Sequence, residues 1–366
     1  MVTFALLLSS LTRISQHLPV LEGALTVNRH LQKMTKLFEG EILGPESFAA
    51  GPDGSVYTGS ADGRLWRIKD GQLTLVARTG IDHPECGSYA LERECGRPKG
   101  MKVDSHGDLI VVDAYKGVLR VKLDTGRVET LMNNFNGSRF LFLNAMDILP
   151  NGTVLISESS TKWERRDYRY EVIETNKLGR ILAFDPVTRK AWLVADGLYL
   201  ANGLTLTHDQ SAILVAEMSM ARITKIHLSG SRAGQREVLV SNLPGYPDNI
   251  KRNSRGHYYV GLGSVRFEGS SPLGSFLDLV GPYPVVKRII TKLIPAPLFD
   301  VFLPKHAILL EISDNGHIVT SHHDPGASTL IAISEAFQHG DNIYIGHFKV
   351  PFVGHLKDYE LQQKGS

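Results

Sequence analysis

The chain alternates short runs of β-branched and aliphatic residues with turns rich in glycine, asparagine and aspartate. Short apolar runs between regular turns predict β-strands joined by hairpins. Six turns of this kind each lead into such a run, and they are Asp53-Gly54, His106-Gly107, Asn151-Gly152, Asp209-Gln210, Arg255-Gly256 and Asn315-Gly316. Most hairpins are followed by a third run, as at residues 63–68, 117–121 and 179–184. One supersecondary unit therefore repeats along the chain.

The spacing of these units indicates the fold class. They recur about every 45 to 60 residues, a period typical of propeller blades rather than of helical solenoids. A sandwich or a barrel would also contain short strands with regular turns. We favour an all-β, six-bladed β-propeller because the units repeat as four-strand sets and the chain continues past the last hairpin into residues 342–346. We expect residues 37–43 to supply an outer strand that closes the ring and leaves no long sheet edge.

One stretch departs from the strand pattern. Residues 271–304 combine an apolar face with a basic face at helical spacing, which predicts a small helical insertion. We consider three roles for this insertion. It packs over one end of the propeller, forms a lid above a central site, or contacts a membrane surface. The polar and aromatic loop of residues 162–168 is expected to wall the same opening or to form a solvated connection. We divide the chain into an N-terminal segment (1–34), a propeller (35–357) and a C-terminal tail (358–366).

One position of the repeat carries the candidate chemistry. Eight residues before the turn residue, the six units place Glu46, Lys99, Asn144, Asn202, Asp248 and Ile308. Equivalent positions of repeats arranged around an axis meet in space, so we expect a ring of side chains. Two carboxylates and two amides are the hard oxygen ligands that calcium takes, whereas zinc would require His or Cys. The ring therefore predicts a calcium site formed by its four oxygen-bearing members.

Two considerations oppose a metal. Asn and Asp at strand starts commonly bond to neighbouring backbone groups instead. Lys99 would direct an ammonium group toward the same axis and repel the ion. Three roles are open for Lys99: it points aside, it acts as an amine of depressed pKa, or it takes the place of the metal.

Composition narrows the class of protein. The chain has 366 residues and is 42% hydrophobic, which is ample for a packed core. Its 40 basic and 38 acidic residues are interleaved and give a formal net charge of +2. No basic stripe follows a phosphate backbone, so nucleic acid is not expected as a partner.

The cysteines and sequons indicate the compartment. Cys86 and Cys95 are the only cysteines. Such a pair is consistent with two free thiols, a sparse metal site or one disulfide. We favour the disulfide, and with it an oxidising compartment, because no His/Cys cluster flanks the pair. Asn136 and Asn151 head glycosylation sequons, although Asn-Gly is also turn chemistry. Asn136 is the better candidate because Asn151 lies in a tight hairpin.

An apolar run occupies residues 2–8. It is shorter than the roughly 17 to 25 residues that span a bilayer, and no basic residue precedes it. We interpret the run either as a shortened signal or anchor segment or as an ordinary amphipathic helix.

Several motifs resemble those of the strictosidine synthase-like family. They are Gly44-Pro45-Glu46-Ser47, Cys95-Gly96-Arg97-Pro98, Asp113-Ala114-Tyr115-Lys116-Gly117, residues 160–168, Ala201-Asn202-Gly203 and Pro247-Asp248-Asn249-Ile250. The resemblance covers about residues 35–355 and implies a six-bladed propeller. It is strongest to a branch of glycoproteins with a single N-terminal type II anchor. That resemblance implies a secretory-pathway protein whose propeller is lumenal or extracellular and membrane-bound through its N-terminal segment, or secreted if the segment is cleaved.

The wider superfamily of paraoxonases and diisopropyl fluorophosphatases resembles the chain at the ring. This resemblance implies Ca²⁺ bound by Glu46, Asn144, Asn202 and Asp248, with Asn249 as a further ligand, and hydrolysis of lactones, aryl esters or organophosphates. Two departures matter. The His that paraoxonases place beside the metal appears as Lys99, and the catalytic Glu of strictosidine synthases would fall near Leu330-Ile331, where no carboxylate stands. Condensation of an amine with an aldehyde is therefore disfavoured.

Three functions follow as hypotheses. The first is a calcium-dependent esterase, arylesterase or lactonase acting on a small molecule, with His323 or Asp113 activating water. A lone His in a turn is, however, more often structural. The second is a non-enzymatic, membrane-anchored binding protein whose calcium stiffens the channel. The third is a synthase-like enzyme that uses Lys99 as an imine-forming amine. A partly apolar pocket that reaches the ion would distinguish the first from the second.

Overall fold

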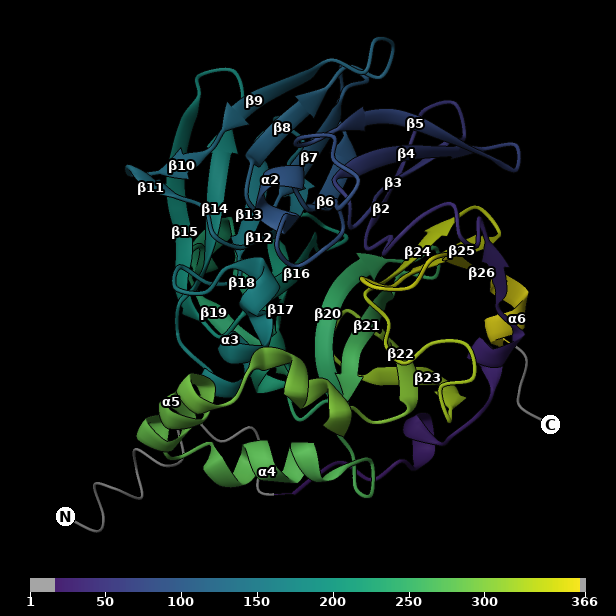
Figure 1. The fold of residues 1–366 in the computed structure, drawn as a ribbon, viewed down its shortest axis with the longest axis vertical. Coiled ribbons are helices and arrows are strands. Elements are labelled where there is room, and N and C mark those ends of the chain that lie inside the picture. Colours follow the sequence, from purple (N-terminus) through teal and green to yellow (C-terminus); the bar gives the residue numbers. More distant parts are fainter. Residues whose placement is uncertain (1–16, 363–366) are drawn as a thin grey trace.

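A computed structural model describes residues 17–362 of the chain. Six four-stranded antiparallel sheets are arranged around an axis (Figure 1). The fold is therefore the predicted six-bladed β-propeller. The apolar run at residues 2–8 lies outside the described residues, and within them no helix is both long and apolar enough to cross a bilayer.

The first three blades follow one another along the chain, each from its innermost to its outermost strand. Blade one contains β2 (Phe48–Ala50), β3 (Val56–Gly59), β4 (Arg64–Lys69) and β5 (Gln72–Arg78). Blade two contains β6 (Pro98–Val103), β7 (Leu109–Asp113), β8 (Gly117–Val121) and β9 (Val128–Met132). Blade three contains β12 (Leu143–Ile148), β13 (Val154–Glu158), β14 (Gly179–Asp185) and β15 (Lys190–Leu198).

The last three blades complete the ring. Blade four contains β16 (Ala201–Leu206), β17 (Ala212–Glu217), β18 (Arg222–His227) and β19 (Arg236–Val240). Blade five contains β20 (Gly245–Arg252), β21 (Tyr258–Val265), β22 (His306–Ile312) and β23 (Ile318–Pro325). Blade six contains β24 (Glu335–His339), β25 (Asn342–Gly346), β26 (Val353–Lys357) and, outermost, β1 (Thr35–Leu37) from the other end of the chain.

The pairing of β1 with β26 closes the ring. Thr35 lies opposite His355 and Leu37 opposite Val353 in an antiparallel register. The predicted closing strand therefore exists, but it ends at Leu37 instead of running to residue 43. Phe38 adopts a left-handed φ of 56°, which turns the chain out of the sheet.

The sixth sequence unit was assigned to the wrong blade. The hairpin at Asn315-Gly316 joins β22 to β23 and so belongs to blade five, while blade six turns at Gly340 between β24 and β25. The helical insertion separates β21 from β22, so a turn-and-strand pattern alone does not show that they share a sheet. The sixth ring position belongs to Ile333, which stands two residues before Glu335, where the pairing of blade six begins. Ile308, which the sequence assigned to this position, lies instead in the third strand of blade five.

The helical insertion occurs where the sequence predicts it. It consists of α4 (Pro272–Val280), α5 (Pro284–Leu293) and η6 (Ala296–Phe302), all between β21 and β22. In Figure 1 it lies beside α3 (Tyr168–Glu174), with which α5 is in contact. The remaining short elements are η1 (Gly23–Leu25), η2 (His30–Lys33), α2 (Glu92–Cys95), β10 (Asn134–Phe135), β11 (Ser138–Arg139), η3 (Arg165–Asp167), η4 (Met218–Met220), η5 (Gly230–Arg232) and α6 (Asp358–Gln362).

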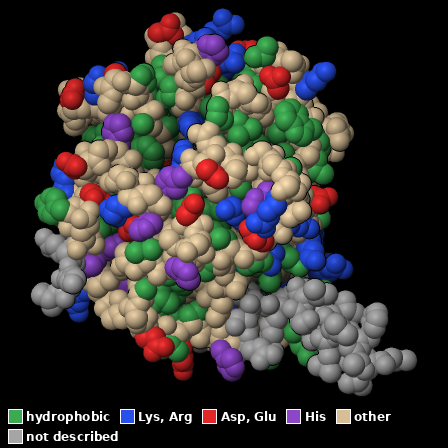
Figure 2. Space-filling view, turned by 180° about the vertical axis from the view of Figure 1, so that it is seen from behind, with side chains coloured by type: hydrophobic (Ala, Val, Ile, Leu, Met, Phe, Trp, Pro, Cys, Tyr) green, Lys and Arg blue, Asp and Glu red, His purple; other side chains and the backbone are tan. Residues whose placement is uncertain are grey.

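The core lies between the faces of neighbouring blades. Second strands such as β7 and β17 are buried along their whole length, because another blade covers each face of the sheet. Innermost strands approach closely: a Cβ added at Gly203 would lie 2.4 Å from the Cα of Asn249 in the next blade. Figure 2 shows that acidic and basic side chains are intermingled on the face opposite to that of Figure 1.

Candidate functional site

The ring residues occupy one structural position in successive blades. In blades two to five, the innermost strand has a register irregularity, and the ring residue stands two positions before regular pairing resumes. Glu46 stands two positions before Phe48, where the pairing of blade one begins. The repeat thus aims a side chain from each of five blades at the axis: Glu46, Lys99, Asn144, Asn202 and Asp248.

These five side chains line one small cavity on the axis, which we call the hub. Its volume is about 30 Å³, and its other lining residues are Phe142, Arg165, Tyr168, Leu200, Met218, Gly263 and Phe348. All five ring side chains are buried. The structure therefore brings together four of the predicted calcium ligands and Lys99. Asn249 is buried, but it does not line the hub.

Three oxygen atoms at the hub have no hydrogen-bond donor within the described part of the chain: Asn144 Oδ1, Asn202 Oδ1 and Asp248 Oδ1. The amide nitrogens are engaged, with Asn144 Nδ2 donating to Ser159 Oγ (2.9 Å) and Asn202 Nδ2 to Met218 Sδ (3.4 Å). Buried acceptors without donors are rare and costly. Three of them around one cavity indicate a site for a cation or a hydrogen-bond donor.

Glu46 carries the counter-charge for two buried cations. Its Oε1 forms an ion pair with Lys99 Nζ, and its Oε2 lies 3.3 Å from Arg97 Nη2. Burial lowers the pKa of Lys99, and the Asp248 carboxylate opposes that shift. Burial also raises the pKa of Asp248, with the Lys99 charge acting in the opposite direction. The hub is thus a buried, charged site in which each ionised group depends on its neighbours.

The donor set fits a calcium ion, with one member opposed. Two carboxylates and two amide oxygens are suitable hard ligands. The described residues contain no group of three or more His, Cys, Asp and Glu side chains able to hold a metal, so such a site depends on the amides. The opposed member is Lys99, because its ammonium already pairs with Glu46 and would compete with the ion.

The two water-activating residues proposed from the sequence do not lie at the hub. His323 lies in β23, the outermost strand of blade five, where its ring nitrogens bond to His306 (2.9 Å) and Ser321 (2.7 Å). Asp113 accepts hydrogen bonds from Arg97 N and Thr79 Oγ1, both 2.7 Å, and from two further backbone N–H groups. Burial raises its pKa, but its oxygens are saturated. These positions fit structural roles.

A larger apolar chamber of about 320 Å³ lies next to the hub. The two share the lining residues Tyr168, Met218, Gly263 and Phe348. Helical insertion residues Leu277, Phe299 and Leu303 line the chamber on another side. The insertion is therefore part of the chamber wall, as the lid hypothesis requires. The loop of residues 162–168 contributes Tyr168 to both cavities and Arg165 to the hub.

His347 is a chamber residue that the sequence did not reveal. Its Nδ1 accepts a hydrogen bond from Lys349 N (3.0 Å), so the proton of the neutral ring is on Nε2. That Nε2 is buried without a partner among the described residues. Burial lowers the pKa of His347 to about 3, which keeps the ring neutral. His347 is therefore a hydrogen-bond donor for a chamber ligand. The sequence feature that could have identified His347 is its position directly after β25, at a strand end that faces the chamber.

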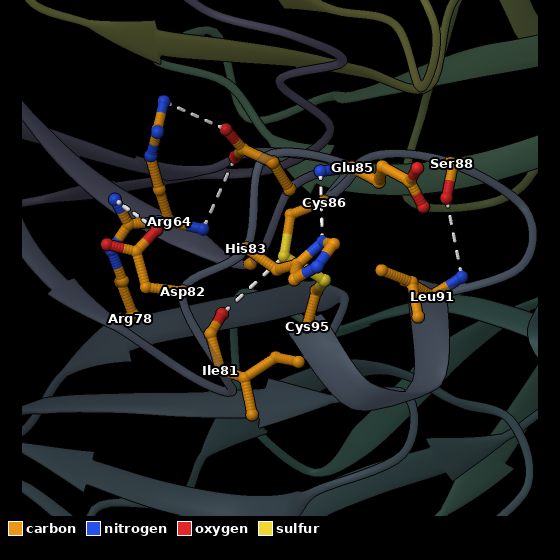
Figure 3. Close-up of a disulfide and its surroundings, with 12 residues drawn as sticks. Arg64, Arg78, Ile81, Asp82, His83, Glu85, Cys86, Ser88, Leu91 and Cys95 are labelled. Atoms are coloured by element: carbon orange, nitrogen blue, oxygen red, sulfur yellow. Dashed lines mark hydrogen bonds and ion pairs between the residues drawn. A yellow bond between two sulfur atoms is a disulfide. The ribbon is translucent and has the colours of Figure 1, made fainter.

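The disulfide braces one wall of the hub. Cys86 and Cys95 are joined, which confirms the predicted pairing (Figure 3). Cys95 ends α2, and Glu92 of the same helix accepts hydrogen bonds from Arg165 Nη1 (2.8 Å) and Tyr115 Oη (2.6 Å). Fixing α2 therefore fixes Arg165. The sequon residues Asn136 and Asn151 are both exposed, and glycosylation at them stays a prediction.

Comparisons with known proteins identify similar chains. A strictosidine synthase family model matches residues 144–231, and a strictosidine synthase-like N-terminal model matches residues 23–68. Adipocyte plasma membrane-associated protein is 37% identical in Salmo salar and 36% identical in Homo sapiens, in each case over 92% of this chain, and 80% and 81% of the relatives are covered. Strictosidine synthase-like protein 10 of Arabidopsis thaliana is 35% identical over 85% of this chain and 84% of its own length.

Solved structures support the fold. A gluconolactonase from Xanthomonas campestris superposes with a TM-score of 0.59 at 13% identity, covering 89% of this chain and 90% of the other. Regucalcin from Agrobacterium tumefaciens, described as a calcium-binding protein, gives a TM-score of 0.55 at 12% identity, covering 88% and 92%. At such low identity these likenesses show the propeller architecture alone.

Proposed function

Because the chain belongs to the strictosidine synthase-like family, together with the adipocyte plasma membrane-associated proteins, we propose that it is a propeller hydrolase of small-molecule esters or lactones. The observation that carries the proposal is the set of three unpartnered oxygens in the hub, next to an apolar chamber that shares part of its lining. The chamber accommodates the apolar part of a substrate, and its carbonyl group reaches the hub. The lactonase and calcium-binding propellers among the structural neighbours agree with this class.

The residues divide the work as follows. Asp248 Oδ1 lines the hub and has no donor among the described residues, so it can take a proton from the attacking water. The water oxygen bonds to the carbonyl carbon, the carbon–oxygen ester bond breaks, and the leaving alkoxide receives the proton that Asp248 took from the water. His347 Nε2–H donates a hydrogen bond to an oxygen of the substrate. The products are a carboxylic acid and an alcohol, or one hydroxy acid from a lactone.

A calcium ion held by Glu46, Asn144, Asn202 and Asp248 would supply Lewis acidity toward the carbonyl oxygen. Arg165, held by Glu92 of the disulfide-braced α2, lines the hub beside these oxygens and would orient the substrate carbonyl. Lys99 competes for the same position through Glu46.

Hydrolysis of phenyl acetate and γ-butyrolactone tests the proposal. We expect activity that chelation abolishes and added Ca²⁺ restores. We also expect Asp248→Asn, which keeps the shape of the side chain, to lower kcat/KM by about 100-fold or more. The matched control is the exposed Asp314→Asn.

Each alternative has its own outcome. Undiminished hydrolysis after chelation would refute the role of the cation. Calcium binding without hydrolysis of either substrate would favour the non-enzymatic binding protein. Borohydride trapping of an aldehyde on Lys99, absent in Lys99→Ala, would favour imine chemistry.

We also propose that the protein is bound to a membrane of the secretory pathway through its N-terminal segment, in a type II orientation. The names of its relatives suggest membrane association. The disulfide agrees with an oxidising compartment. Protease protection of the propeller in microsomes tests the orientation, because a lumenal propeller is digested only after detergent is added.

A further inference from the structure

The helical insertion presents an exposed apolar surface that nothing else in the described chain resembles. Eleven large hydrophobic side chains of the described residues are at least half exposed. Seven of them lie within residues 279–301, and they are Leu279, Tyr283, Val285, Ile289, Leu293, Leu298 and Val301. Scattered exposed apolar residues are normal, but a contiguous group marks a surface that binds something. We call these seven residues the apolar patch.

Helix α5 shows that the patch is not incidental, because its amphipathicity is inverted. Val285, Ile289 and Leu293 follow each other at i, i+4 spacing on one face, with 68%, 50% and 75% of their surface exposed. The face toward the protein carries Lys287 and Thr291, both buried, and Thr291 Oγ1 donates to Glu174 Oε1 (3.0 Å). A helix that meets water normally turns its polar face outward. This helix instead turns Lys287 and Thr291 inward and three aliphatic side chains outward.

The charged side chains of the insertion are also divided between its inner and outer sides. Its only acidic residues, Asp278 and Asp300, both face the propeller: Asp278 pairs with Arg266 (2.6 Å), and Asp300 pairs with Arg169 (2.6 Å) and Lys349 (3.0 Å). The cations Arg288 and Lys292 of α5 are exposed, and they flank the apolar residues of that helix. The outward surface is therefore apolar and cationic. Such a surface is complementary to an anionic lipid bilayer.

The N-terminal segment approaches the same region. Pro19 accepts a hydrogen bond from Glu268 N (2.9 Å), a few residues before α4 begins. Leu21, Leu25 and Phe267 all pack against the same buried core cluster. The first described residues of the chain therefore lie close to the start of the insertion.

From these observations we propose that α4, α5 and η6 dock the propeller onto a lipid surface containing anionic headgroups. The apolar patch enters the headgroup and acyl boundary, and Arg288 and Lys292 lie at the level of the phosphates. Asp278 and Asp300 hold the insertion to the propeller during this contact. The inner side of the same insertion lines the chamber, so the chamber wall lies next to the lipid.

Site-directed labelling of the full chain tests the proposal separately from the N-terminal segment. The only two cysteines form the disulfide, so Leu293→Cys offers a single site for an environment-sensitive fluorophore. Val187→Cys, 86% exposed between β14 and β15, is the matched control. On adding phosphatidylcholine–phosphatidylserine vesicles, we expect a blue shift and a rise in emission at position 293 and no change at position 187. Equal or absent changes at both positions would overturn the proposal.

A second measurement compares vesicle affinity. The triple variant Val285→Ser, Ile289→Ser, Leu293→Ser should bind these vesicles about tenfold or more weakly than the parent. The control variant Val187→Ser, Leu193→Ser, Val238→Ser removes exposed apolar side chains elsewhere and should bind normally. Arg288→Glu with Lys292→Glu should weaken binding only when phosphatidylserine is present. If the parent instead forms dimers that the triple variant lacks, with equal vesicle affinity, the patch binds a second copy and the lipid proposal fails.

Discussion

At the scale of single residues, the hub is governed by the cost of burying charge. Glu46 and Lys99 are 2% and 4% exposed, and Arg97 is as deeply buried as Glu46. Bulk water has little access to these groups, so the charge of each depends on its buried partner. The pairing between Glu46 and Lys99 is therefore both the support of the hub and the competitor of a metal ion.

Removing one partner tests this dependence. Glu46→Gln leaves Lys99 and Arg97 without their shared carboxylate, and we expect a loss of about 3 to 5 kcal/mol in the free energy of unfolding. Adding Lys99→Met should recover much of the loss, because the uncompensated ammonium is then gone. Urea unfolding measures both. Glu39→Gln, which breaks the exposed Lys36–Glu39 pair, should cost less than about 1 kcal/mol. A similar small cost for Glu46→Gln would contradict this description of the hub.

Some residues could be assigned from sequence and others could not. Glu46, Asn144, Asn202 and Asp248 share one offset from a turn, and a repeat places equal offsets at equal positions around an axis. His347 and Arg165 lack such an offset, because each reaches its cavity from a segment outside the repeated strands whose path depends on packing. His323 was assigned wrongly for a related reason: its hairpin was attributed to the innermost part of blade six, whereas β23 is the outermost strand of blade five.

At the scale of elements, the N-terminal segment meets blade five at a cluster of four buried or half-buried histidines, and His30 is the member that comes from that segment. His30 of η2 lies 3.0 Å from His322 of β23, and His306 of β22 lies 2.9 Å from His323. Burial lowers the pKa of His322 and of His323 to about 3. The nearest charged groups are Glu311, Arg255 and Asp358 near His322, and Asp324 near His306.

Acid should destabilise this contact. A folded pKa below the unfolded value of about 6.5 means that the unfolded chain binds more protons between pH 6.5 and 3. Stability is therefore full above pH 6.5 and falls as the pH drops, by up to about 1.4 kcal/mol per pH unit for each histidine. We expect His322→Asn to flatten the slope of unfolding free energy between pH 6.5 and 5, where most carboxylates stay ionised. The exposed His106→Asn should leave it unchanged, and equal slopes in all three proteins would contradict the assignment.

Elements differ in how far sequence determines them. Hairpins and the insertion at residues 271–304 follow from local periodicity, and both occur as predicted. The assignment of strands to blades does not follow from local periodicity, because β21 and β22 pair across 40 residues of intervening chain that contain three helices. The inverted face of α5 is likewise invisible to periodicity, because a helical pattern has an apolar side without saying which side meets the protein.

At the scale of the whole molecule, closure of the ring turns a sequence repeat into a site. β1 and β26 join the two ends of the chain in one sheet, and that sheet holds blade six against blades one and five. Only a closed ring brings residues from five blades into one cavity of about 30 Å³. The central claim is that this cavity holds a cation through oxygens supplied by four separate blades.

X-ray diffraction from crystals grown with and without Ca²⁺ tests that claim most directly. We expect a calcium-dependent peak on the propeller axis, with oxygens of Glu46, Asn144, Asn202 and Asp248 at about 2.3 to 2.6 Å and the Lys99 ammonium displaced from Glu46. An axis without such a peak at saturating Ca²⁺, with Lys99 still paired to Glu46, would contradict the account.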